Sequence, residues 1–209
     1  MTRTRVKFCG ITRVEDAMAA AELGVDALGF VFDAGSKRHI TPAVARSLCG
    51  SLPPFMRTVA LFRNAPAEAV VETLEVLYPD LLQFHGEESP EYCQQFSWPY
   101  LKAVPMGETQ DLADWALRYG EARGLLVDAH GKGEMGGTGR SFDWARLNQK
   151  VDKPIVLAGG LTPDNVAAAI ATVHPHAVDV SSGIESQPGV KDRSRMQRFM
   201  QEVRRADAA

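Results

Sequence analysis

Cys9 is the residue whose surroundings most favour chemistry. It ends a short apolar run, residues 6–9, and Gly10 and Thr12 follow at once. This order predicts a strand that turns directly into a helix capped by Thr12. Because backbone N–H groups and the helix dipole stabilise negative charge at a helix N-terminus, we expect a thiolate there that can remove a proton. The alternative is a small buried hydrophobic residue.

A carboxylate ends a second apolar run. Asp128 follows residues 124–127, and a carboxylate at the end of such a strand is unfavourable unless it is paired or functional. Partial burial would raise the pKa of this carboxyl, which suits a general acid at neutral pH. The alternative is that Asp128 hydrogen-bonds the Gly-rich segment 131–139, which we interpret as a mobile loop.

Two small-residue segments indicate an anion site. Gly159 and Gly160 allow the backbone to approach a ligand closely, and Ser181, Ser182 and Gly183 supply hydroxyl and N–H groups. Gly-Gly alone would be read as a tight turn. Because barrels often bind phosphate with the loops after their seventh and eighth strands, the combination favours a phosphate site.

Two further side chains are candidates for substrate binding. Arg38 could hold a carboxylate in a bidentate fork, and its alternative is a surface ion pair. His85 either lines the pocket or is a structural, hydrogen-bonded histidine. The other histidines do not form a metal-ligand spacing, and no nucleotide-binding glycine motif occurs, so we expect neither a metal nor a cofactor. An acid, a base and a phosphate anchor together suit a proton-transfer isomerisation of a sugar phosphate.

The elements that must position these residues alternate between strand and helix. The predicted strands cover residues 6–9, 27–32, 58–62, 81–85, 101–104, 125–128, 155–158 and 177–181. Four predicted helices are marked by their capping residues, which are Thr12, Thr41, Ser89 and Thr162; the first of them has Glu15 as the second member of its capping box and ends at Gly24. The other predicted helices cover residues 66–77, 112–119, 143–147 and 195–205. This pattern predicts an α/β fold, a (β/α)8 TIM barrel in one domain over residues 1–209, whose site lies at the carboxyl ends of the strands. A doubly wound open sheet is the alternative.

Composition restricts the classes of partner. The chain has 209 residues and a net charge of −3, whereas nucleic-acid-binding proteins usually carry a basic face. Its three cysteines cannot form a full disulfide framework, and no apolar run is long enough for a signal peptide or a membrane span. We therefore expect a cytoplasmic protein that binds a small molecule, with no nucleic acid or membrane partner. A monomer is the default, and a dimer is possible.

The chain also resembles the phosphoribosylanthranilate isomerases of tryptophan biosynthesis over nearly its full length. The resemblance is carried by residues 7–12, 36–38, 83–86, 126–128, 136–139, 142–144, 159–161 and 178–185, in this order. It implies a cofactor-free Amadori rearrangement of N-(5-phospho-β-D-ribosyl)anthranilate to 1-(2-carboxyphenylamino)-1-deoxy-D-ribulose 5-phosphate. By this resemblance Cys9 is the general base and Asp128 the general acid. Arg38 would hold the anthranilate carboxylate, and Gly159, Gly160, Ser181, Ser182 and Gly183 would hold the phosphate.

Two positions depart from the family pattern, and three alternatives stay open. Ala158 stands where many relatives carry serine, and Arg63 stands where they commonly carry an apolar residue. A histidine-pathway isomerase acting on an aminoimidazole substrate is the first alternative, but that group uses a carboxylate where Cys9 stands. A phosphate-binding barrel without catalysis and a redox sensor built on Cys9 are the others.

Overall fold

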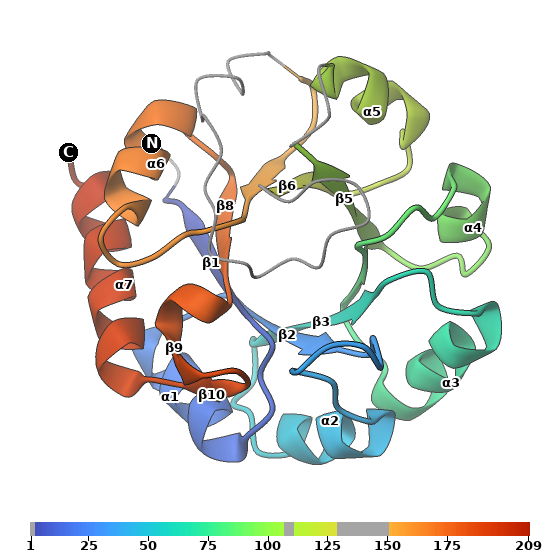
Figure 1. Ribbon diagram of the computed structural model, residues 1–209, viewed down its shortest axis with the longest axis horizontal. Coiled ribbons are helices and arrows are strands. Elements are labelled where there is room, and N and C mark those ends of the chain that lie inside the picture. The colour runs from blue at the N-terminus through green and yellow to red at the C-terminus, as the bar shows by residue number, and fades with distance from the viewer. Residues whose placement is uncertain (1–2, 107–110, 129–150) are drawn as a thin grey trace.

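Eight parallel strands close into a barrel in the computed structural model, which describes residues 3–106, 111–128 and 151–209 (Figure 1). The strands are Arg5–Cys9 (β1), Ala27–Val31 (β2), Arg57–Phe62 (β3), Leu81–Phe84 (β4), Tyr100–Pro105 (β5), Gly124–Asp128 (β6), Ile155–Leu157 (β7) and Ala177–Val180 (β8). Every strand end lies within one residue of its prediction. The first and last strands pair in parallel, with Lys7 opposite Asp179, so the barrel is confirmed and the open sheet is excluded.

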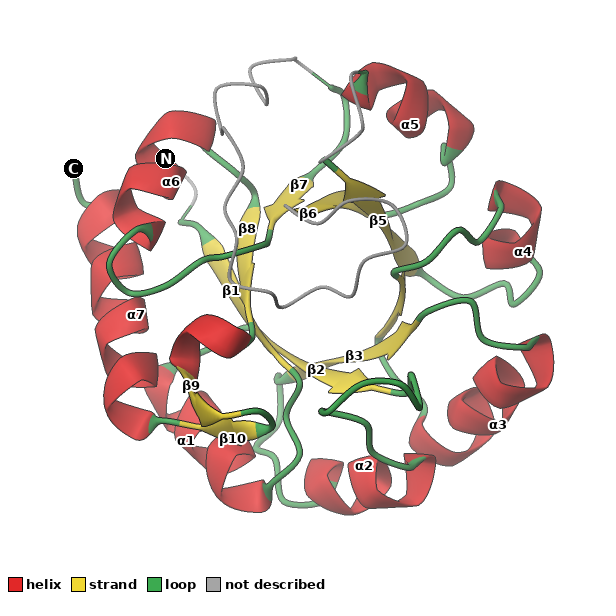
Figure 2. Ribbon diagram, in the orientation of Figure 1, coloured by secondary structure: helices red, strands yellow, loops and turns green. Residues whose placement is uncertain are grey.

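Helices surround the strands on the outside of the barrel (Figure 2). The described helices are Val14–Leu23 (α1), Pro42–Cys49 (α2), Ala67–Leu77 (α3), Pro90–Gln94 (α4), Leu112–Arg118 (α5), Val166–Val173 (α6) and Arg193–Asp207 (α7). None of these described helices is long and apolar enough to cross a membrane. Thr41 and Ser89 cap α2 and α4 as predicted, and Gly24 ends α1 in the left-handed conformation. The expected helix 143–147 and loop 131–139 lie outside the described residues.

Two predicted helix starts are wrong. The Thr12 hydroxyl donates a hydrogen bond to the Gly189 carbonyl instead of capping a helix, and α1 begins only at Val14. Thr162 accepts a hydrogen bond from the Asp164 backbone within a turn, and α6 begins three residues after Pro163, at Val166. In both cases the hydroxyl satisfies a nearby loop backbone group, which competes with helix capping.

A short hairpin after β8 was not predicted. A 3₁₀ turn at Ser182–Ile184 leads into strands Glu185–Gln187 (β9) and Val190–Lys191 (β10), which pair antiparallel. The Lys191 N–H donates to the Asp16 carboxylate of α1 over 3.0 Å. The hairpin is therefore fastened over the end of β1, beside α1 (Figure 1).

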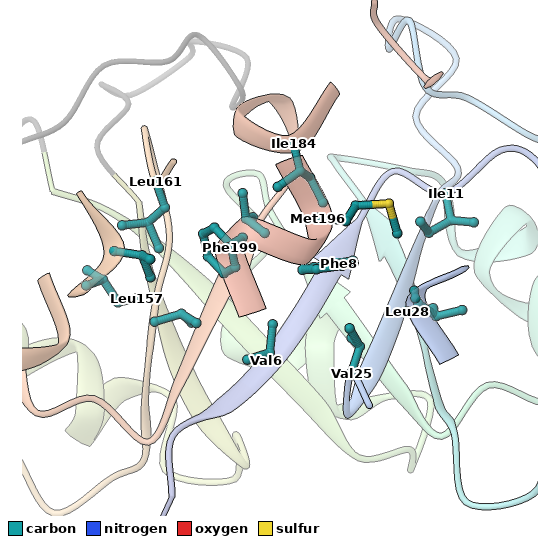
Figure 3. Packing of buried hydrophobic residues seen from close by; sticks show 14 of the residues in the cluster. Val6, Phe8, Ile11, Val25, Leu28, Leu157, Leu161, Ile184, Met196 and Phe199 are labelled. Carbon is teal, nitrogen blue, oxygen red and sulfur yellow. The ribbon is translucent and has the colours of Figure 1, made fainter. Parts of the chain in front are cut away.

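Side chains along β1 alternate between the helices and the barrel interior. Val6 and Phe8 join the hydrophobic core outside the barrel, where the Phe8 ring meets Phe199 of α7 edge-on at 6.0 Å between centroids (Figure 3). Successive residues of a strand point to opposite faces, so Lys7 and Cys9 face the barrel interior. The interior below the site is filled by Leu101, Ala103, Leu126, Val156, Ala158 and Ala177.

The capping role of Thr41 gives a test of this local structure. Its side chain accepts a hydrogen bond from the Val44 N–H over 3.3 Å. We expect Thr41→Ala to lower the free energy of unfolding by about 1 kcal/mol, because that N–H loses its partner. Ser47→Ala, an exposed change within the same helix, is the control and should not destabilise. Urea unfolding measures both, and equal midpoints would contradict the capping role.

Candidate active site

A cavity of about 300 Å³ opens at the carboxyl ends of the strands. Eight of the nine residues predicted to act lie in its lining, namely Cys9, Arg38, His85, Asp128, Gly159, Gly160, Ser181 and Ser182. The ninth, Gly183, lies beside the Leu161 carbonyl, which also belongs to a lining residue. The fold thus brings residues from six separate segments of the chain to one place.

The Cys9 thiol lies at the end of β1, but no helix begins directly after it. Because α1 starts at Val14, the predicted contact between the thiol and a helix N-terminus is wrong. Burial raises the pKa of the thiol above its usual value, the Lys7 ammonium counteracts this, and the Asp179 carboxylate adds to it. Burial and the Lys7 ammonium thus act on the thiol in opposite directions.

Asp128 faces His85 across the cavity. The two side chains are buried, with 3.4 Å between Asp128 Oδ2 and His85 Nε2. On the other side of the ring, Gln83 Nε2 lies 2.9 Å from His85 Nδ1. If the amide donates to Nδ1, the imidazole carries its proton on Nε2, which faces the carboxylate. The alternative interpretations of His85 therefore combine: it is hydrogen-bonded and it lines the pocket.

Arg38 forms a buried fork with the hairpin. Its Nε and Nη2 atoms donate to the two carboxylate oxygens of Glu185 over 2.8 and 2.7 Å, and Lys191 Nζ lies 2.8 Å from the same carboxylate. Burial alone would raise the pKa of Glu185, but Arg38 and Lys191 outweigh it and hold the pKa below its usual value. Arg38 is thus ion-paired, though inside the site and not on the surface. Within the described residues its Nη1 has no protein partner, which leaves the two N–H groups of this nitrogen as donors for a ligand.

The backbone after β7 and β8 fits an anion. Gly159 and Gly160 have φ values of +81° and +64°, a left-handed conformation that glycine adopts without strain. Ser181 Oγ is buried and has no hydrogen-bond partner among the described residues. A buried hydroxyl without a partner is unfavourable unless a ligand or water satisfies it. Among the described residues, no group of three His, Cys, Asp or Glu side chains is arranged to hold a metal ion.

Gly183 tests the tight packing of this anion site. A Cβ atom there would lie 1.9 Å from the Leu161 carbonyl oxygen, so the backbone after β7 must move. We expect Gly183→Ala to raise the Kd for inorganic phosphate by about ten-fold, equivalent to about 1.4 kcal/mol. Gly120→Ala is the matched control, because its Cβ would meet only the Leu117 carbonyl at 3.5 Å. Calorimetric titration measures both, and an unchanged Kd for Gly183→Ala would contradict the prediction.

Sequence reasoning gave no role to several buried polar residues of the site. Lys7, Gln83, Asp179, Glu185 and Lys191 are each at most 7% exposed. Strand alternation is the signal that could have found two of them, because Lys7 and Gln83 precede Cys9 and His85 by two residues and so share their faces. Glu185 and Lys191 belong to the hairpin, for which we found no sequence pattern.

Comparison with known proteins shows which family this chain is similar to. The family model described as N-(5'-phosphoribosyl)anthranilate (PRA) isomerase matches residues 6–202. A relative of that name from Xanthomonas campestris pv. campestris is 50% identical over 98% of this chain and 95% of its own. The phosphoribosyl anthranilate isomerase from Thermus thermophilus superposes with a TM-score of 0.88 at 37% identity, covering 97% of this chain and 99% of its own. A third, 38% identical with a TM-score of 0.82 over 96% of this chain and 98% of its own, was solved with reduced 1-(o-carboxyphenylamino)-1-deoxyribulose 5-phosphate.

Proposed function

Because the chain belongs to the N-(5'-phosphoribosyl)anthranilate isomerase family, we propose that Cys9 and Asp128 are the base and acid of its reaction. The chain is a phosphoribosylanthranilate isomerase of tryptophan biosynthesis. The observation that carries the proposal is the position of the two groups. Cys9 ends β1 and Asp128 ends β6, on non-adjacent strands of a closed ring, and both line the one cavity.

The proposed reaction uses these two groups in two proton transfers. Asp128 gives a proton to the furanose ring oxygen, and the ring opens to a Schiff base. Cys9, as the thiolate, removes the proton from C2′ and leaves an enolamine, which tautomerises to the ketone. The two groups act in succession on one bound sugar, as an acid and a base that line the same cavity. His85 orients the Asp128 carboxyl through the 3.4 Å contact.

The rest of the cavity holds the two ends of the substrate. The ligand of the solved relative carries a carboxyphenylamino group at one end and a phosphate at the other. In this chain Gly159, Gly160, Ser181, Ser182 and Gly183 would receive the phosphate, chiefly through backbone N–H groups. Arg38 would hold the anthranilate carboxylate with the donors that its fork to Glu185 leaves over.

Arg38→Met tests the carboxylate contact. We expect KM for phosphoribosylanthranilate to rise about ten-fold or more, because a charged hydrogen bond worth about 1.5–3 kcal/mol is lost. Steady-state kinetics measures it, with Arg46→Met on the exposed side of α2 as the control. If KM for Arg38→Met matched that of the control, the guanidinium would not bind the substrate.

Turnover of the intact protein tests the activity itself. Phosphoribosylanthranilate is generated in the cuvette, and loss of its fluorescence is followed beside the aminoimidazole substrate of the histidine-pathway isomerases. We expect rapid loss with the anthranilate substrate. Turnover of the imidazole compound alone, or tight binding of the product without turnover, would replace the proposal with one of the two alternatives.

Three expectations about the setting of this activity belong to the proposal. The chain works as one domain over residues 1–209, and it acts in the cytoplasm, where its free thiols at Cys9, Cys49 and Cys93 stay reduced. It acts as a monomer by default, with a dimer as the alternative. Light scattering of the purified protein decides between these two states.

A further inference from the structure

We propose that Lys7 is a positioning residue that stabilises the thiolate form of Cys9, and that Asp179 holds Lys7 in place. The inference rests on the proposed role of Cys9 as the base. It assigns a function to the ion pair of Lys7 and Asp179 inside the barrel.

Strand geometry places the two side chains on one face. Lys7 and Cys9 are two residues apart in β1 and both point into the barrel. Lys7 lies directly opposite Asp179 of β8, and its Nζ donates to Asp179 Oδ1 over 2.9 Å. The two side chains are only 5% and 8% exposed, so the ammonium is fixed beneath the thiol and cannot leave for solvent.

Gly29 of β2 gives the space in which thiol and ammonium meet. Gly29 lies opposite Cys9 in the register of β1 and β2. A Cβ atom there would lie 2.8 Å from Cys9 Sγ and 3.0 Å from both Lys7 Nζ and Lys7 Cε. The sulfur and the ammonium therefore converge over the same backbone atom, and any side chain on Gly29 would displace one of them.

The other charged groups near Cys9 have hydrogen-bonding partners of their own. Lys191 of β10 bonds to the Cys9 carbonyl oxygen over 2.6 Å and to Glu185 of β9. Arg38, after β2, forms its fork with the same Glu185. Asp128 of β6 faces His85. Lys7 and Asp179 are the charges with the largest effects on the pKa of Cys9, and Lys191 lowers that pKa to a smaller extent.

The directions of the pKa shifts of Lys7 and Cys9 agree with this assignment. Burial would lower the pKa of Lys7, but Asp179 and Cys9 outweigh it and raise the pKa, so the ammonium persists. The same ammonium acts against the burial that raises the pKa of Cys9. A buried thiolate needs a fixed cation close by. Lys7 supplies it where the helix expected from the sequence is absent.

The rate of alkylation of Cys9 by iodoacetamide tests the proposal directly. The rate follows the thiolate fraction, and mass spectrometry of the Cys9 peptide separates it from Cys49 and Cys93. At about pH 7 we expect Lys7→Met to slow alkylation about ten-fold, the effect of a rise of about one unit in pKa. We expect Asp179→Asn to speed it about three-fold, because the amide oxygen still accepts the hydrogen bond that holds Lys7 in place, whereas the negative charge near the sulfur is removed.

Opposite effects of the two halves of one ion pair distinguish the proposal from a structural role. If the pair only braced the barrel, loss of either partner would expose the thiol and change alkylation in the same direction. Lys153→Met is the control, since it removes an ammonium that bonds to the Gly120 and Ala122 carbonyls at the opposite end of the barrel. We expect that control to leave Cys9 alkylation unchanged.

Kinetics gives a second readout. In Lys7→Met the acid limb of the pH profile of kcat should move to higher pH, while KM stays constant. If Lys7→Met does not fold, Lys7→Met/Asp179→Asn removes the pair without leaving an uncompensated charge, and its alkylation should still be slower than in the wild type. Unchanged alkylation and an unchanged pH profile would overturn the proposal. Turnover by Cys9→Ala would instead overturn the proposed role of Cys9 as the base. The two failures can be told apart, because the alkylation rate of Cys9 can be measured whether or not the thiol acts in catalysis.

Discussion

Cys9→Ala and Asp128→Asn should each lower kcat by about a thousand-fold, the range in which loss of a general acid or base falls. Alanine has no group that accepts the C2′ proton, and an amide cannot give a proton to the ring oxygen. Both variants keep the cavity, its Arg38 fork and its glycine turns. Binding of reduced 1-(o-carboxyphenylamino)-1-deoxyribulose 5-phosphate should therefore stay close to wild type.

Single-turnover fluorescence and calorimetry measure the two halves of this prediction. Cys49→Ala and Asp164→Asn are suitable controls, because Cys49 is half-buried near the other end of α2 and the Asp164 side chain is 73% exposed. Wild-type turnover in Cys9→Ala or Asp128→Asn would remove the role assigned to that residue. Lost binding together with lost turnover would make the residue a substrate contact instead.

Lys102→Met should destabilise the fold by about 3–5 kcal/mol, the usual effect of leaving one half of a buried ion pair. Lys102 Nζ is fully buried and bonds to the Phe84 and Gly86 carbonyls and to Glu88 Oε2. The Tyr119 ring lies 5.7 Å away and adds a cation–π contact. Without the ammonium, the Glu88 carboxylate would stay buried against backbone carbonyls.

Urea unfolding of Lys102→Met and Lys102→Met/Glu88→Gln separates the lost ion pair from lost packing. The double variant should regain part of the stability, because no charge is then left buried. Glu88 also accepts hydrogen bonds from the Asn64 and Gly86 N–H groups, so the recovery should be incomplete. Equal stability of the single variant and the wild type would show that the pair contributes nothing net.

The barrel could be predicted from the sequence because its strands are short, apolar and evenly spaced. Each predicted strand end is within one residue of the structure, since burial on both faces leaves a continuous apolar run that polar turns interrupt. The helix starts were less predictable. Thr41 and Ser89 precede proline and act as caps, whereas Thr162 also precedes proline and does not. Whether such a hydroxyl caps a helix depends on which backbone N–H group lies beside it in the fold, and the Ser/Thr-Pro motif does not contain that information.

The candidate site likewise contains residues that the sequence predicts and partners that it does not. Cys9, Asp128 and Arg38 could be named because each ends or follows a strand, where a barrel gathers its functional groups. The partners of these groups could not. The contact of Arg38 with Glu185 spans 147 positions and that of Lys7 with Asp179 spans 172, so no local spacing encodes them. Sequence reasoning therefore identified the N-terminus of α1, and not Lys7, as the group that stabilises a thiolate at Cys9.

The contacts of Lys191 also bear on the order in which the parts of the site are synthesised. This lysine bonds to the carbonyl of Cys9, which lies 182 positions before it, and to that of Ser181. Synthesis proceeds from the N-terminus, so all eight barrel strands leave the ribosome before Lys191 does. A chain halted after β7 can form local strand–helix units, yet the end of β1 then has neither its neighbour β8 nor its lysine. A ribosome-bound chain that ends before residue 191 therefore lacks one of the groups that surround Cys9.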